Sequence, residues 1–431
     1  MSRVAVIGAG YVGLTTAACL ADLGNDVMVV DIDREKIAQL QRHEVPFYEP
    51  GLIELVERNV KAGRLGFTTS YSEAVPGAEY AIIAVSTPEG EGGEADLSYV
   101  EAAATSIADS MDGPLVVVNK STVPPLTGDM VSRVVSKRNA SHRAAVVSNP
   151  EFLREGSAIQ DFMHPDRVVI GSHDVEAAAK VAKLYAPLEA RVLITPNIYT
   201  AEMVKYASNA FLAARISFIN EIARICERVD ADAKLVAEGM GLDKRIGSSF
   251  LDAGIGYGGS CFGKDVKALA ALAGRFDYHP ELLQAVMDIN RDQRMLVIDK
   301  LRECLETLDG RIVGLLGLAF KPNTDDLRDA PSLDIARVLI AAGAEVRAYD
   351  PAAMARARVL MPEVEFSADA YALADGADGL VLVTEWKEFR DLDLGRLKGS
   401  MRKAVMVDGR NIYDPSMMRS LGFTYRGIGR D

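Results

Sequence analysis

The stretch Val4-Ala-Val-Ile-Gly-Ala-Gly-Tyr-Val-Gly13 decides the fold of this chain. A β-rich run leads into three glycines with GxGxxG spacing, a helical pattern follows, and the next β-rich run ends at Asp31. In a dinucleotide-binding βαβ unit, Gly8 makes the tight turn, Gly10 lets the pyrophosphate approach and Gly13 lets the helix pack on the strand. The carboxylate of Asp31 suits ribose hydroxyls and repels a 2′-phosphate, so the pattern predicts an NAD site rather than an NADP site.

Strand and helix patterns alternate after this unit, which predicts a doubly wound parallel sheet. Polar side chains follow three of the strand patterns, at the sheet edge where ligands bind in such folds. Loop polarity would explain one such residue, but four at one edge favour a ligand site. The strand patterns are 80–85, 115–118 and 144–147, and the polar residues are Thr87, Thr122, Glu151 and Glu155.

A second glycine-rich stretch, residues 254–265, contains a single cysteine, Cys261, with Lys264 close behind it. We expect glycine at this density to serve backbone freedom and close approach to a ligand rather than packing. A thiol on such a loop with a nearby cation is placed like a nucleophile, because the thiolate is the reactive form. Taken alone, the stretch fits an ordinary glycine-rich turn equally well.

A long helix is predicted over residues 200–230, which contain no glycine or proline. Lys205 and Asn209 lie one turn apart on it and share a face. They either point into a pocket, where a cation and an amide donor stabilise charge on oxygen, or Lys205 extends its amine to solvent. Further helical patterns cover residues 231–240, 265–273 and 280–305.

The last part of the chain repeats a doubly wound pattern without the glycine fingerprint. Strands are predicted at 311–317, 345–350, 379–383 and 404–408. The polar residues 320–329, together with Arg410, could supply cations to a phosphate ligand, although a solvated loop explains them equally well. The predicted fold is therefore α/β, with two Rossmann-like domains (1–196 and 306–431) joined by a long central helix and a small helical middle domain (197–305).

Composition limits the class of protein. The 431 residues are 49% hydrophobic and 25% charged, as in ordinary globular chains, with a net charge of −13 that argues against nucleic-acid or anionic-membrane partners. No apolar run is long enough for a membrane span, and a strand pattern begins at Arg3 without a signal peptide. The 4 cysteines form no CxxC pair, so we expect no disulfide framework, no metal site and a reducing, cytoplasmic location.

Several further motifs carry a resemblance to the UDP-glucose/GDP-mannose dehydrogenase family over essentially the whole chain. They are Gly8–Leu14, Tyr48-Glu-Pro-Gly51, Ser86-Thr-Pro88, Asn149-Pro-Glu-Phe-Leu-Arg-Glu-Gly156, Lys205 with Asn209, Gly256–Asp265, Phe320–Arg328 and Asp408-Gly-Arg410. The resemblance implies that NAD binds the first domain, that the sugar nucleotide binds the last domain, and that the chemistry occurs between them. It also implies dimerisation through the central region.

The resemblance further implies an oxidation of UDP-glucose to UDP-glucuronate that removes four electrons and reduces two NAD. Cys261 would be the nucleophile and would form a thiohemiacetal and then a thioester, because an aldehyde must first become tetrahedral before it can lose a second hydride. Lys205, Asn209 and Asp265 would surround the sugar C6 oxygen with an ordered water, and Thr122 and Glu151 would help to position and activate water.

The binding residues implied by the resemblance fall into two sets. The cofactor set is Gly8, Gly10, Val12, Gly13, Asp31, Lys36, Thr87, Thr122, Glu155, Lys264 and Arg328. The substrate set is Phe152, Leu153, Arg154, Glu155, Lys205, Asn209, Phe250, Gly258, Lys321 and Arg410, with Arg245 reaching the active site of the partner in a homodimer.

Three alternatives stay open at this point. The same chemistry could act on GDP-mannose or a UDP-N-acetylhexosamine, although residues 166–171 and the cysteine loop favour UDP-glucose. A two-electron hydroxyacid dehydrogenase of the 6-phosphogluconate type also uses a Lys and an Asn on a helix, but Cys261 and the third domain argue against it. An NAD-sensing protein without catalysis is disfavoured, because every expected catalytic residue type is present.

Overall fold

The computed structural model describes residues 1–430. The chain divides into two compact units, Met1–Ser208 and Asn209 onward. The boundary falls inside one long helix, α9 (Ile198–Val229), close to the predicted range 200–230. The predicted division into three domains at 196 and 305 stays a prediction.

The first unit contains an eight-stranded sheet with the order β3-β2-β1-β4-β5-β6-β7-β8. All neighbours are parallel except β6 and β7, which pair antiparallel. The order of the first six strands is that of a Rossmann fold, as predicted. The strands are β1 (Arg3–Ile7), β2 (Asp26–Val30), β3 (Leu65–Thr68), β4 (Tyr80–Ile83), β5 (Leu115–Asn119), β6 (Ala144–Ser148), β7 (Val168–Gly171) and β8 (Val192–Thr195).

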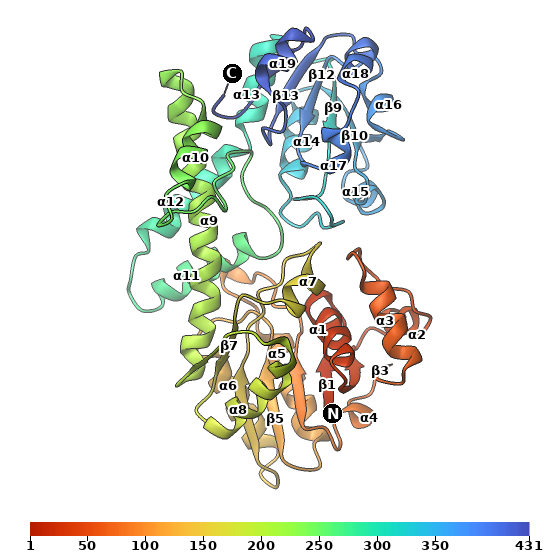
Figure 1. The fold of residues 1–431 in the computed structure, drawn as a ribbon, viewed down its shortest axis with the longest axis vertical. Coiled ribbons are helices and arrows are strands. Elements are labelled where there is room, and N and C mark those ends of the chain that lie inside the picture. Colours follow the sequence, from red (N-terminus) through yellow and green to blue (C-terminus); the bar gives the residue numbers. More distant parts are fainter. Residues whose placement is uncertain (431) are drawn as a thin grey trace. The chain divides into compact units, whose positions relative to one another are not determined.

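Helices cover both faces of this sheet (Figure 1). Alternate side chains of β1 enter opposite cores: Val4 and Val6 join one cluster, whereas Ala5 and Ile7 join the other. The helices are α1 (Tyr11–Asp22), α2 (Arg34–Gln41), α3 (Leu52–Lys61), α4 (Tyr71–Ala74), η1 (Glu91–Gly93), α5 (Ser98–Ser110), α6 (Thr127–Arg138), α7 (Ala158–Met163), α8 (Val175–Leu184) and η2 (Ala186–Leu188).

The second unit contains a six-stranded sheet with the order β11-β10-β9-β12-β13-β14, parallel throughout. This order repeats that of the first six strands, so the second Rossmann-like domain is confirmed. Its strands are β9 (Ile312–Leu316), β10 (Glu345–Tyr349), β11 (Glu365–Phe366), β12 (Gly379–Leu382), β13 (Val405–Asp408) and β14 (Thr424–Arg426). Its helices are α14 (Pro331–Ala341), α15 (Met354–Leu360), α16 (Ala370–Ala374), α17 (Lys387–Arg390), α18 (Leu394–Ser400) and α19 (Pro415–Ser420).

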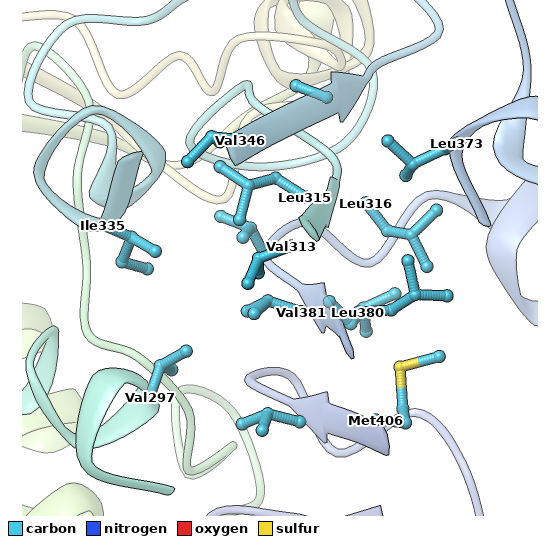
Figure 2. Packing of buried hydrophobic residues seen from close by; sticks show 14 of the residues in the cluster. Val297, Val313, Leu315, Leu316, Ile335, Val346, Leu373, Leu380, Val381 and Met406 are labelled. Atoms are coloured by element: carbon cyan, nitrogen blue, oxygen red, sulfur yellow. The ribbon is translucent and has the colours of Figure 1, made fainter. Parts of the chain in front are cut away.

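The core of this domain lies between its sheet and the surrounding helices. Figure 2 shows Leu315 and Leu316 from β9 and Leu380 and Val381 from β12, with Ile335 of α14 lying beside the strands. The central strands β9 and β12 are apolar along their whole length because both of their faces are covered.

The helical part of the second unit differs from the sequence prediction in two places. The predicted helix 280–305 is two helices, α12 (Glu281–Gln293) and α13 (Leu296–Leu305), because Arg294 at the break turns inward and pairs with Asp329 at 2.8 Å and Asp334 at 2.6 Å. The helix predicted over 265–273 is α11 (Phe262–Gly274), which begins directly after Cys261. Helix α10 (Ala233–Gly241) lies near its predicted range.

None of the helices within residues 1–430 combines the length and the apolar character that a bilayer span requires. Cys19 and Cys226 are buried, as expected for small apolar side chains. Cys304 and Cys261 are half-buried.

Candidate active site

The glycine fingerprint forms the turn between β1 and α1. Gly8 has φ +105°, and a Cβ there would lie 2.5 Å from the carbonyl oxygen of Ala84. A Cβ at Gly13 would lie 1.9 Å from the carbonyl oxygen of Gly8, so these two glycines serve the turn and the helix packing, as predicted. Gly10 caps the N-terminus of α1 and has no neighbouring atom within 4 Å of a Cβ. That open approach to a helix N-terminus fits a dinucleotide pyrophosphate.

Asp31 is fixed at the end of β2 and faces this turn. Its carboxylate accepts hydrogen bonds from the amide of Ala9 at 2.8 Å and the amide of Asp33 at 3.0 Å. The amine of Lys36 lies 3.1 Å from the same carboxylate. An acidic group held beside the glycine turn is the arrangement that recognises a ribose diol, so the residues present fit NAD.

The ends of β4 and β5 are joined by hydrogen bonds between side chains and backbone. The hydroxyl of Thr87 donates to the carbonyl of Thr122 at 2.9 Å, and the hydroxyl of Ser121 donates to the carbonyl of Val85 at 2.6 Å. The structure therefore brings together two of the polar residues that the sequence placed at this edge, and Ser121 is a contact that the sequence analysis missed.

Lys205 is buried and makes an ion pair within the first unit. Its amine lies 3.1 Å from Glu151, and both side chains are 5% exposed. It also lies 5.3 Å from the ring centre of Phe152. The amine therefore does not extend to solvent, and the alternative of a solvated lysine is wrong. Sequence reasoning named both Lys205 and Glu151 but did not predict that they pair.

A second buried lysine, Lys120, was not singled out from the sequence. Its amine donates to the side-chain oxygen of Asn149 at 3.1 Å and to the hydroxyl of Tyr185 at 3.2 Å. Burial lowers the pKa of Lys120 to about 8; the charge of Glu151 raises it and that of Lys205 lowers it further. The detectable signal was a lysine directly after the buried strand β5.

The predicted substrate segment after β6 is held by three carboxylates of the first unit. Glu151 accepts from the amide of Leu153 at 2.5 Å, and Asp161 accepts from the amide of Arg154 at 2.8 Å. The guanidinium of Arg154 also pairs with Asp161. Glu49 accepts from the amide of Gly156 at 2.6 Å. Two of the amides in the predicted stretch, those of Leu153 and Arg154, thus already bind within the chain. Val12 and Glu155 are half-buried.

In the second unit, Cys261 is the N-cap residue of α11 and is half-buried. Its sulfur lies 3.6 Å from the hydroxyl oxygen of Ser260. The first turn of a helix presents backbone N–H groups and the positive end of the macrodipole, which favour a thiolate. This feature was missed from the sequence because the helix was predicted to start at Asp265.

Asp265 lies in the first turn of α11 and is fully buried. The amide of Asn209 donates to one of its carboxylate oxygens at 2.6 Å, and the amine of Lys264 lies 2.7 Å from the other. The structure thus joins three of the predicted site residues of this unit in one cluster. Both carboxylate oxygens of this buried side chain therefore have a hydrogen-bond donor.

The glycines before Cys261 do have packing roles, contrary to expectation. A Cβ at Gly258 would lie 2.3 Å from the carbonyl oxygen of Asp329, and one at Gly254 would lie 2.8 Å from that of Gly409. A Cβ at Gly259 would lie 2.7 Å from the ring of Phe320, and the amide of Gly259 donates to the carbonyl of Arg328. The loop lies directly against the C-terminal domain, so glycine is required to avoid overlap as well as to adopt positive φ.

Phe262, the residue after Cys261, packs against two other aromatic side chains. The ring of Phe262 lies 5.8 Å from that of Tyr257 and 6.2 Å from that of Phe250, both edge to face. Phe250 adopts a left-handed backbone conformation with φ 62°. The predicted substrate residue Phe250 therefore packs next to the helix turn that carries Cys261.

The cations predicted to bind phosphate lie at loops of the C-terminal domain. Arg410 donates to the carbonyl oxygens of Val383 at 2.7 Å and Gly256 at 3.1 Å. Lys321 lies over the ring of Phe320. Arg328 pairs with Asp326 at 2.7 Å, and its side chain is 63% exposed.

A cavity of about 450 Å³ lies in the second unit at the carboxyl ends of β12 and β13. Its lining carries both charges, with Arg410 and Lys234 among the cations and Asp252 and Glu385 among the carboxylates. Arg245 is not part of this lining. Its side chain is 89% exposed and pairs with the neighbouring Asp243 at 2.6 Å. Among residues 1–430, no group of His, Cys, Asp and Glu side chains is arranged to hold a metal ion.

Three consecutive parts of this chain match the domains of one known protein family. Residues 2–189 match the NAD binding domain of the UDP-glucose/GDP-mannose dehydrogenase family, residues 199–292 match its central domain and residues 314–415 match its UDP binding domain. The chain belongs to this family. It is therefore an oxidoreductase, and its first domain is the NAD-binding domain of the family.

Relatives extend the likeness over the whole chain. A UDP-glucose 6-dehydrogenase of Bacillus subtilis is 48% identical over 100% of this chain and 94% of its own length. The structure of a UDP-glucose dehydrogenase from Pyrobaculum islandicum matches with a TM-score of 0.94 and 40% identity, covering 100% of this chain and 98% of that one. A UDP-D-ManNAc dehydrogenase from Pyrococcus horikoshii matches with a TM-score of 0.89 and 30% identity over 99% of both chains.

Proposed function

We propose that this protein oxidises UDP-glucose to UDP-glucuronate in two successive steps through covalent attachment to Cys261. The observation that carries the proposal is the placement of this cysteine at the N-terminus of α11, one turn from the buried Asp265 cluster. A two-electron alcohol dehydrogenase needs no such thiol, whereas oxidation to the acid level needs a nucleophile that makes the aldehyde carbon tetrahedral, a role that a thiolate can fill. The UDP-glucose dehydrogenases among the relatives support the choice of substrate.

The reaction balances as follows. The primary alcohol loses a hydride and a proton to give an aldehyde. The thiolate of Cys261 adds to the aldehyde carbon, and the alkoxide that results takes up a proton to form a thiohemiacetal. Loss of a second hydride with the hydroxyl proton gives a thioester. Water then cleaves the carbon–sulfur bond, which releases the carboxylate and two protons and returns the thiolate. NAD, when bound, supplies the oxidant by accepting one hydride in each oxidation.

The chain's own residues handle the charges and protons of these steps. Asn209 and Lys205 supply an amide donor and a cation, the groups that stabilise an oxygen anion; one such donor is worth about 3 kcal/mol. Asp265 and Glu151 are the carboxylates available to move protons through water. Glu151 is held 3.1 Å from the amine of Lys205, which fixes the position of its carboxylate beside the proposed water. Thr122 is proposed to position that water.

The proposed binding residues form one set for the cofactor and one set for the substrate. We assign NAD to the glycine turn, Asp31 and Lys36, with Thr87, Glu155, Lys264 and Arg328 as further contacts. The segment 152–155 and the loops carrying Phe250, Gly258, Lys321 and Arg410 are assigned to the sugar nucleotide. The mixed charge of the cavity beside Arg410 suits the alternating donors and acceptors of a pyrimidine ring better than a diphosphate alone.

The decisive experiment is the number of NADH formed per sugar nucleotide consumed. Purified protein is incubated with NAD and limiting UDP-glucose, GDP-mannose or a UDP-N-acetylhexosamine. Two equivalents with UDP-glucose and none with the others are expected. One equivalent would contradict the four-electron reaction, and turnover of an acetylated sugar alone would favour the second candidate, which the Pyrococcus horikoshii UDP-D-ManNAc dehydrogenase supports.

We also propose a homodimer formed through α9. Phe211, Phe218 and Ile225 recur at intervals of two turns on that helix and are 63%, 46% and 49% exposed. An apolar stripe of this size on a helix is a typical protein interface. In such a dimer, the exposed Arg245 is proposed to reach the partner's substrate site.

Mixing two inactive variants tests this arrangement. Arg245→Ala and Cys261→Ala are unfolded and refolded together, so that mixed dimers form. If each site takes its arginine from the partner, a mixed dimer has one intact site, and the mixture recovers roughly a quarter of wild-type activity. No recovery, with dimers present by light scattering, would mean that Arg245 acts in its own subunit.

A further inference from the structure

The motif Tyr48-Glu-Pro-Gly51 has no part in the proposed chemistry, yet its carboxylate is buried. Glu49 is 6% exposed and accepts hydrogen bonds from the amide of Gly156 at 2.6 Å and the amide of Ala158 at 2.7 Å. The hydroxyl of Tyr11 also donates to it. These three donors are uncharged, so the buried carboxylate is held here by hydrogen bonds from neutral groups.

Tyr11 is the first residue of α1 and directly follows Gly10 in the dinucleotide turn. Besides Glu49, its hydroxyl oxygen accepts from the amide of Gly156 at 3.0 Å and lies 3.2 Å from the carbonyl oxygen of Arg154. Burial and the neighbouring Glu49 raise the pKa of Tyr11 far above its ordinary value, so the hydroxyl keeps its proton and remains a donor.

Tyr11 and Glu49 therefore connect two parts of the first unit that bind different ligands. One part is the turn at the N-terminus of α1, which fits the pyrophosphate of NAD. The other is the segment 152–156, which we assign to the sugar nucleotide. The segment itself is irregular between β6 and α7, and its amides at Arg154 and Gly156 are held by side chains rather than by a sheet or helix. Its conformation thus depends on these contacts.

We propose that the Tyr11–Glu49 pair couples the two binding sites. A pyrophosphate at Gly10 fixes the first turn of α1 and with it the hydroxyl of Tyr11, which holds Glu49 and the segment 154–158 in the form that a sugar nucleotide meets. Each ligand then tightens the binding of the other by the same factor, since coupling between two sites is reciprocal. This inference rests on the proposed function of the segment 152–155.

The test measures binding of NADH, which cannot oxidise UDP-glucose and so forms a stable ternary complex. NADH is titrated by its fluorescence with and without saturating UDP-glucose, in the wild type, Tyr11→Phe and Glu49→Gln. We expect UDP-glucose to tighten NADH binding roughly 5-fold or more in the wild type. Tyr11→Phe, which removes only the hydroxyl, should bring this factor close to one while changing the NADH affinity alone by less than about threefold.

Tyr48→Phe is the matched control, because Tyr48 is 47% exposed and its hydroxyl removal should leave the factor unchanged. Hydrogen exchange gives a second measurement, with the amides of Gly156 and Ala158 exchanging faster in Tyr11→Phe. A factor of one in the wild type, or a wild-type factor in Tyr11→Phe, would overturn the proposal. Normal turnover of UDP-glucose without coupling would remove only this inference, whereas failure of UDP-glucose to bind at all would remove the proposed function as well.

Discussion

The amide of Asn209 donates to the carboxylate of Asp265 at 2.6 Å, and this bond ties the long helix α9 to the helix that begins at the cysteine. Asp265 has no exposed surface, and Lys264 occupies its other oxygen. The carboxylate therefore fixes the orientation of the first turn of α11. The position of Cys261 at the start of this turn therefore depends on the buried side chain of Asp265.

Replacement of Asp265 by Asn should reduce both stability and turnover. The neutral side chain leaves Lys264 without its partner, and the loss of a charge-assisted bond should lower the free energy of unfolding by about 1–3 kcal/mol. Turnover should fall by roughly 100-fold or more, because we propose that the carboxylate also moves protons during the reaction. Urea unfolding and steady-state NADH formation measure the two effects. Asp109→Asn, at the exposed ion pair with Arg138, is the control, and equal effects of both variants would contradict this role of Asp265.

Substitutions at the buried pair of Lys205 and Glu151 should have strongly non-additive effects on the unfolding free energy. Lys205→Met or Glu151→Gln alone leaves one buried charge without its partner and should cost about 3–5 kcal/mol of unfolding free energy. The double variant should recover a large part of that loss while remaining inactive. Denaturant unfolding of the four proteins in the cycle gives the coupling energy. Additive losses would mean that the two side chains do not interact in solution.

The two glycines of the dinucleotide turn predict opposite effects of the same substitution. Gly13→Ala places a Cβ against the carbonyl oxygen of Gly8 and should lower the unfolding free energy by about 1–3 kcal/mol. Gly10→Ala meets no atom of the protein and should leave the stability of the NAD-free protein almost unchanged while weakening NAD binding roughly 10-fold or more. Thermal unfolding and NADH fluorescence separate the two, and unaltered NADH affinity in Gly10→Ala would place the cofactor elsewhere.

Lys120 predicts a distinctive dependence of stability on pH. In the folded protein its pKa is about 8, whereas an unfolded lysine keeps its proton to about pH 10.4. Between these values the unfolded state binds more protons, so the contribution of Lys120 to the unfolding free energy rises with pH. The difference between wild type and Lys120→Met should therefore shift in favour of the wild type from pH 8 to pH 10 in urea unfolding. Parallel curves would show that Lys120 does not titrate in this window.

Much of the fold follows from local patterns, and the exceptions have physical causes. The glycine turn and its strands were predictable because the Gly8 and Gly13 requirements are steric and local. The break at Arg294 was not, because nothing in the sequence there ends a helix; the carboxylates that draw the arginine inward come from distant residues. The short strand β3 carries a glycine and lacked a clear pattern.

The candidate site was predictable in its residue types but not in its contacts. Lys205 and Asn209 share a helix face, which the spacing reveals, but their partners Glu151 and Asp265 are set by tertiary structure. Lys120 was overlooked because a lysine after a strand is usually solvated. Its burial depends on Asn149 and Tyr185, which come from other elements.

The loop before Cys261 is shaped by parts of the chain that are synthesised after it. Gly258 fits only against the backbone of Asp329, and Gly254 only against that of Gly409. When the ribosome has just added Cys261, the residues against which its loop packs have not yet been synthesised. The loop can therefore form only when almost the entire chain has emerged. Incomplete chains would therefore carry the dinucleotide turn together with an unformed cysteine loop.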